Sequence, residues 1–82
     1  MSALGLETES ITHPRLSLQA ARRRLFAAQL DEHALMERRR VATERREMFG
    51  PRLEKKLQRV REHIDAIRTE MLWLDEEVRR NA

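Results

Sequence analysis

An unbroken apolar ladder in the C-terminal third of the chain constrains the fold more than any other feature. Its eight members are separated alternately by four and three residues, the spacing that keeps side chains on one face of a helix. The ladder consists of Leu53, Leu57, Val60, Ile64, Ile67, Met71, Leu74 and Val78. These residues alternate between heptad positions d and a, as in coiled coils. The ladder therefore predicts a second helix packed against it, in this chain or in a partner.

The composition of the 82-residue chain favours a single all-α domain. Aromatic residues make up only 4% and tyrosine is absent, which argues against a β-fold. Charged residues make up 38%, and strong helix formers dominate. The absence of cysteine excludes disulfides and thiolate metal sites. We find no signal-peptide pattern and no apolar run of about 18 residues, so the sequence predicts a cytoplasmic protein without a membrane span.

Two prolines and a glycine set the predicted helix boundaries. Pro14 suits the first turn of a helix, because its missing N–H has no partner there in any case. Gly50-Pro51 supplies the residue types that end one helix and begin the next. The sequence therefore predicts helices over 14–49 and 52–80, joined by a tight turn.

These signals predict an antiparallel, coiled-coil-like helical hairpin over residues 14–82. Residues 1–13 show no period and are predicted to form a flexible tail. The alternative is one long kinked rod, in which Pro51 would cost about 3 kcal/mol. Folding the chain about the turn places Val41 opposite Val60 of the ladder, on a face of the first helix that two glutamates interrupt.

The first helix carries two apolar stripes at helical spacing. One stripe, which includes Leu30, Ala34 and Val41, is expected to face the ladder. The second stripe comprises Leu18, Ala21, Leu25, Ala28, Glu32, Leu35, Arg39, Ala42, Arg46 and Phe49. A helix that is apolar on two sides is normally sandwiched between two neighbours, and one hairpin supplies only one. The second stripe, with Leu72 and Trp73 outside the ladder, therefore predicts a four-helix bundle of two hairpins or the binding of a different protein.

The predicted protein partner is a second copy of the chain, as a homodimer or larger oligomer, or another protein. The residues predicted to form protein interfaces are Leu18, Leu25, Leu35, Leu53, Leu57, Val60, Ile64, Ile67, Met71, Trp73, Leu74 and Val78. A parallel pair of second helices would set Lys56 against Arg61 and Glu70 against Asp75. Because like charges meet in both cases, antiparallel or heterotypic pairing is favoured.

The middle of the chain is basic. Residues 14–61 carry fourteen Arg or Lys against six Asp or Glu, although the net charge of the chain is only +3. The candidate phosphate-binding residues are Arg38, Arg39, Arg40, Arg45 and Arg46. Consecutive helical residues point about 100° apart, so these arginines spread around the helix and favour a solvated face. Nucleic-acid binding or regulation is the alternative function, and no recognised binding motif supports it.

The sequence indicates no catalytic, metal or cofactor site. Two glycines are too few for a phosphate-binding loop, and there is no cysteine nucleophile. His33 and Glu37 are four residues apart, but two ligands do not complete a metal site. The sequence therefore predicts a non-enzymatic interaction module without a cofactor, such as a small assembly factor, chaperone, adaptor or structural subunit.

Overall fold

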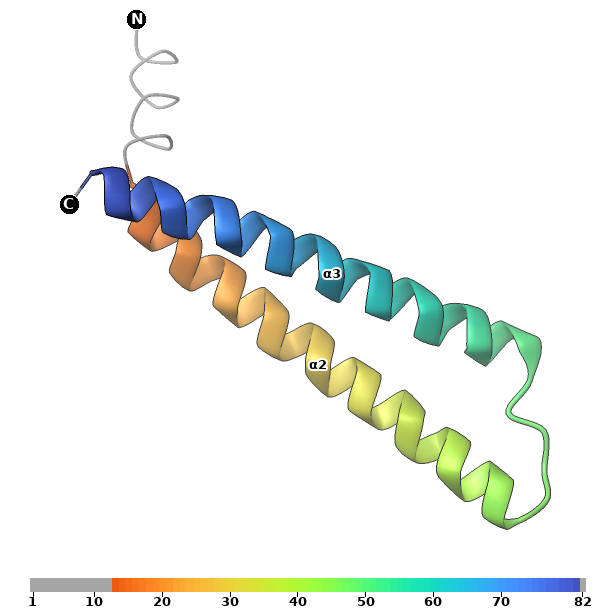
Figure 1. Cartoon of the computed structure of the whole chain (residues 1–82). Helices are drawn as coiled ribbons and strands as arrows, with labels where there is room; N and C mark the ends of the chain where they lie inside the picture. Colours follow the sequence, from red (N-terminus) through yellow and green to blue (C-terminus); the bar gives the residue numbers. More distant parts are fainter. Residues whose placement is uncertain (1–12, 82) are drawn as a thin grey trace, which may run out of the picture.

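The computed structural model describes residues 13–81, which form two long helices packed side by side (Figure 1). Helix α2 spans Pro14–Glu44 and helix α3 spans Pro51–Arg80. They run antiparallel, so the described ends of the chain lie together and the connecting loop lies at the other end (Figure 1). The predicted all-α helical hairpin is confirmed. The predicted tail lies outside the described residues apart from His13.

Both helices begin with proline, as the sequence indicates. Pro14 is the first residue of α2, and the carbonyl oxygen of His13 accepts a hydrogen bond from the Ser17 N–H at 3.2 Å. In α3, Glu54 lies in the first turn, and two arginines lie in the last turn. This distribution of charge complements the helix dipole. Neither helix contains a stretch that is long and apolar enough to cross a membrane.

Helix α2 ends at Glu44, five residues before the predicted end, and residues 45–50 form a loop in place of the tight turn. The N–H of Glu47 donates to the Ala42 carbonyl at 2.8 Å, and the N–H of Arg46 donates to the Thr43 carbonyl at 3.1 Å. This pair of bonds is the Schellman motif, which satisfies the last carbonyls of a helix. The prediction was wrong because Arg46, and not a glycine, occupies the left-handed position of the motif, with φ of 57°.

Three ion pairs between the helices give their register. The pairs are Arg24–Glu70 at 2.9 Å, Glu32–Arg61 at 3.2 Å and Arg39–Glu54 at 3.5 Å. The residue numbers of each pair add up to 93 or 94, whereas a turn at Gly50-Pro51 requires 101. Because α2 ends earlier than predicted, each of these α3 residues pairs with an α2 residue seven or eight positions earlier in the chain than the predicted turn requires. Arg61 and Glu70, two of the charges that would meet a like charge in a parallel pair of α3 helices, find opposite partners on α2.

The stripe of α2 that faces α3 is the second one, so the predicted pairing of Leu30, Ala34 and Val41 with the ladder is wrong. Leu30 is 55% exposed and Ala34 is exposed. The physical reason lies in the charges that interrupt each stripe. On the second stripe, Glu32 forms an ion pair with Arg61 of α3, and Arg39 forms an ion pair with Glu54 of α3. The second stripe also buries more leucine side chains, so it offers the larger hydrophobic gain.

The core of the hairpin is a narrow seam between the two helices. Its buried cluster comprises Leu18, Ala21, Ala28, Ile64, Ile67 and Leu74, with Leu25, Val60, Met71 and Val78 packed against it. Leu57 and Ile67 are the most deeply buried large side chains. Every ladder position is buried or half-buried. The ladder therefore packs against a helix of its own chain, and the described part of the molecule buries no polar side chain.

Candidate interaction surface

The seam uses most of the residues that were predicted to form protein interfaces. Leu18, Leu25 and Leu35, which were predicted to face a further partner, lie against α3 within the hairpin or are buried in its seam. The eight ladder residues are buried or half-buried in the same seam. Of the predicted set, only Trp73 is exposed, with 59% of its surface accessible. A contact of these residues with a second protein stays a prediction.

A different row of mainly apolar side chains on α2 is exposed, apart from its last member, which is half-buried. This row, which we call the outer stripe, consists of Leu16, Ala20, Arg23, Ala27, Leu30, Ala34, Glu37 and Val41. Its members are separated alternately by four and three residues, so they lie along one face of the helix. Leu30 follows Leu25 of the seam by five residues, which places the two side chains about 140° apart around the axis. From Leu16 to Leu30 the outer stripe therefore points away from α3, whereas Ala34, Glu37 and Val41 line a hollow beside the loop and the start of α3.

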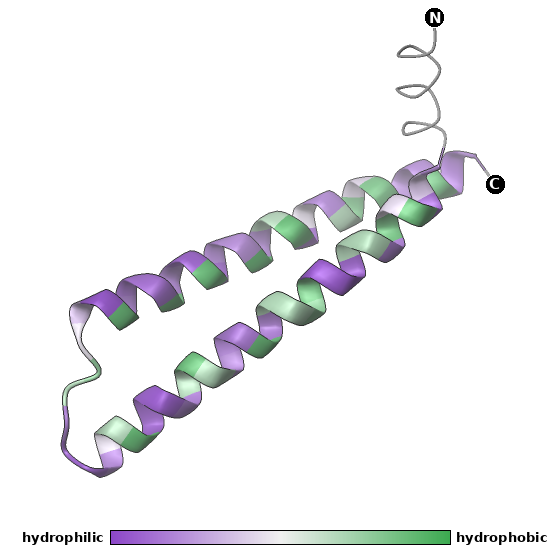
Figure 2. Ribbon diagram, turned by 180° about the vertical axis from the view of Figure 1, so that it is seen from behind, coloured by the Kyte–Doolittle hydropathy of each residue, from purple (hydrophilic) through white to green (hydrophobic). Residues whose placement is uncertain are grey.

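The outer stripe makes α2 apolar on two sides while the hairpin covers only one. Leu16 is 62% exposed, the three alanines of the stripe are exposed, and Val41 is half-buried. Only Arg23 and Glu37 interrupt the stripe with charge. In Figure 2 hydrophobic segments recur along both helices between hydrophilic ones. Sequence reasoning found both stripes of this helix but exchanged their roles.

A shallow hollow of about 410 Å³ lies along one side of the seam near the chain ends. Its lining residues are Leu18, Arg22, Arg68, Met71, Leu72 and Asp75. Leu72 stands at its rim with 69% of its surface exposed, and Phe26 on α2 is 64% exposed. The sequence predicted that Leu72 lies outside the ladder, but it gave no sign that Phe26 is exposed. These side chains extend the apolar surface beyond the outer stripe.

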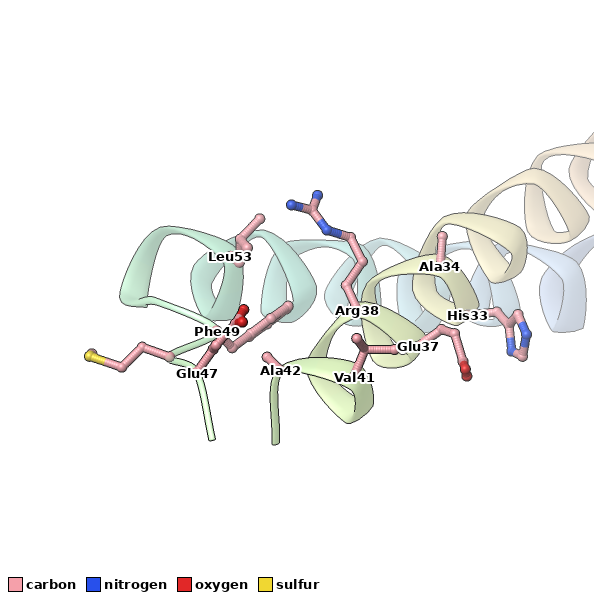
Figure 3. A pocket seen from close by; sticks show the side chains of 10 residues that line it. His33, Ala34, Glu37, Arg38, Val41, Ala42, Glu47, Phe49 and Leu53 are labelled. Atoms are coloured by element: carbon pink, nitrogen blue, oxygen red, sulfur yellow. The ribbon is translucent and has the colours of Figure 1, made fainter. Parts of the chain in front are cut away.

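A second hollow, of about 490 Å³, lies at the loop end (Figure 3). Phe49 was predicted to end the first helix, but it lies in the loop and is half-buried between the end of α2 and the start of α3. Val41, Ala42 and Leu53 contribute apolar walls, and Arg38 lies at the edge. The ring of Phe49 thus fills part of the space that opens between the helices near the loop.

The candidate phosphate-binding arginines do not form one basic face. Arg40 donates hydrogen bonds to the carboxylates of Glu37 and Glu44. The hydrogen bond with Arg40 holds the pKa of Glu37 below its ordinary value, and it raises the pKa of Arg40. Arg39 is paired with Glu54. The remaining three arginines are exposed, and nucleic-acid binding stays a prediction that salt-dependent binding to generic DNA or RNA would test.

The titratable side chains are spread along the rod. His33 and Glu37, the one spacing noted as a potential ligand pair, both lie exposed on α2. Among residues 13–81, no group of three or more His, Asp or Glu side chains is arranged to hold a metal ion. The exposed apolar side chains are the candidate interaction surface of residues 13–81.

Comparison of the chain with models of protein families, with curated proteins and with solved structures finds no match. We therefore infer a function from the geometry and chemistry of the exposed surfaces. Among these, the outer stripe is the longest, because it runs from the first turn of α2 to its last turn.

Proposed function

We propose that this chain is a non-enzymatic protein-interaction module that binds through the outer stripe of α2. The observation that carries the proposal is the exposure of apolar side chains at helical spacing opposite a complete seam. A helix that is apolar on two sides is normally covered on both. Exposed apolar patches of this kind commonly mark binding surfaces. An assembly factor, chaperone, adaptor or structural subunit would use such a surface.

The energetics support docking of a helix on the outer stripe. Burial of one leucine contributes about 1.5–3 kcal/mol. Leu16, Leu30 and Val41 lie along one face, and Phe26 stands beside it. The alanines between them present little bulk, so a partner helix can approach the axis of α2 closely. The folded hairpin stays intact on binding, because the seam lies on the other side of the helix.

The proposed function is tested by the proteins that accompany the chain in its native cell. A tagged full-length chain is compared with its Leu30→Glu variant, which places a charge in the middle of the outer stripe. We expect the variant to lose associated proteins, including untagged copies of the chain, because a buried unpaired carboxylate is costly.

Ala66→Glu is the matched control, because it places the same charge at an exposed position of α3 outside the outer stripe. Circular dichroism checks that both variants keep their helical content. Equal recovery of the same proteins with the wild-type chain and with both folded variants would contradict the proposed function.

A further inference from the structure

We propose that the outer stripe binds a second copy of this chain, with the two α2 helices antiparallel and a two-fold axis at Leu30. This inference rests on the proposed function and names the partner of the same surface. It follows from the placement of the two charged residues that interrupt the stripe, from the size of the residues between them, and from the capacity for further hydrogen bonds that both charged groups keep within the hairpin.

The charges of the outer stripe are arranged symmetrically about Leu30. Arg23 lies seven residues before it and Glu37 lies seven residues after it. Reversing a second α2 about Leu30 therefore brings Arg23 of each copy beside Glu37 of the other. The same contact forms twice, since a two-fold interface uses one surface patch from both copies. In a parallel pair each charge would meet its own copy, so repulsion disfavours that arrangement.

The apolar positions match in the same arrangement. Ala27 and Ala34 lie on either side of Leu30, three residues before it and four residues after it. In the antiparallel pair, Ala27 of one copy therefore lies near Ala34 of the other. Alanine at these positions permits a short distance between the helix axes. The side chain of Leu30 meets its own copy at the centre, where it is removed from water.

Both charged groups are available for this contact. Arg23 is exposed, and none of the residues 13–81 forms an ion pair with it. Glu37 receives the hydrogen bonds of Arg40 at Oε1. Its other carboxylate oxygen remains for a second donor, because a carboxylate accepts several hydrogen bonds. The two-fold contact therefore adds to the pairing of Glu37 and Arg40 without replacing it.

The experiment measures the mass and dimer dissociation constant of the full-length chain by light scattering and sedimentation equilibrium. We expect the wild-type chain to have twice its monomer mass of 9.8 kDa. Arg23→Glu should raise the dissociation constant about tenfold, because two attractive contacts become repulsive. Adding Glu37→Arg to this variant should restore the dissociation constant, since opposite charges meet again.

Arg59→Glu is the matched control, because it makes the same change of charge at an exposed position on α3. It should leave the dissociation constant unchanged. A monomeric wild-type chain overturns the inference. So does a dimer that responds equally to Arg23→Glu and Arg59→Glu, or one that the double variant does not restore.

A second measurement tests the position of the axis. The chain has no cysteine, so Leu30→Cys introduces a single thiol. Two thiols at a two-fold axis between closely packed helices can form a disulfide, which requires a Cα separation of about 4.4–6.8 Å. We expect Leu30→Cys to form a covalent dimer on mild oxidation, and Arg59→Cys to remain uncrosslinked. Equal crosslinking of the two variants would overturn the inference.

These results distinguish a failure of the proposed partner, the second copy, from a failure of the proposed function. A monomeric wild-type chain that loses other associated proteins on Leu30→Glu overturns the second copy as partner and leaves the interaction module standing. A monomeric chain whose associated proteins do not change overturns both.

Discussion

Two residues of the loop, Arg46 and Gly50, have positive φ and determine where the helices end. Arg46 has φ of 57°, a left-handed conformation that costs a residue with a Cβ about 1–2 kcal/mol. The Schellman hydrogen bonds around it hold this conformation in place. Gly50 has φ of 90° and ψ of 148°, a combination that is essentially restricted to glycine. The glycine therefore shapes the start of α3, while an arginine performs the role of the helix-ending glycine.

Arg46→Gly should stabilise the hairpin by about 1 kcal/mol, because glycine adopts the left-handed conformation without steric strain. The measurement is the midpoint of thermal unfolding by circular dichroism. Arg45→Gly is the matched control: Arg45 has an ordinary φ of −86°, so this change should lower the midpoint. The assignment of the helix end would be contradicted by a lower midpoint for Arg46→Gly.

At the scale of the helices, the spacing of apolar residues predicted α3 and its buried face, whereas the residue types around the loop did not predict where α2 ends. The ladder from Leu53 to Val78 identified α3 and its buried face, because all of its positions are apolar. The end of α2 was not predictable from residue types, since the Schellman motif has an arginine in place of glycine. The choice between the two stripes of α2 was also not predictable. Both stripes have the same spacing, and the ion pairs of Glu32 and Arg39 depend on a register that the sequence does not state.

The register is tested by the pair Glu32–Arg61. Glu32→Arg and Arg61→Glu should each destabilise the hairpin, and the double variant should regain about 0.2–1 kcal/mol relative to the sum of the two, as measured by urea unfolding. The gain is expected because the side chains are 3.2 Å apart across the helices. Strictly additive effects would show that the two residues do not meet.

The importance of the seam is tested at Ile64, which is 4% exposed. Ile64→Asp should abolish folding, because it places a carboxylate among the buried side chains of the core. Loss of the far-UV helical signal is the expected result. Ala66→Asp puts the same charge at an exposed position of α3 and should keep the signal. Retention of wild-type helicity and mass by Ile64→Asp would refute the proposed role of the ladder.

At the scale of the whole molecule, the described residues 13–81 form a flat rod with dimensions of 59 × 27 × 14 Å. Two helices in one layer can shield only the sides that face each other, so a large share of each helix surface stays in water (Figure 1). For α3 this outer surface is mostly polar, whereas α2 carries the outer stripe there. Because of this shape and this distribution of apolar side chains, α2 is the helix on which we propose that a further partner binds.

Helix α2 uses one stripe to pack against α3, and we propose that it uses the other to bind a partner. The most direct test is the helical content of two matched variants, Leu35→Glu in the seam and Leu30→Glu in the outer stripe, measured by far-UV circular dichroism. Leu35 is 5% exposed and Leu30 is 55% exposed. We expect Leu35→Glu to lose most of its helical signal and Leu30→Glu to keep it. An unfolded Leu30→Glu variant beside a folded Leu35→Glu variant would mean that the stripes have the opposite roles.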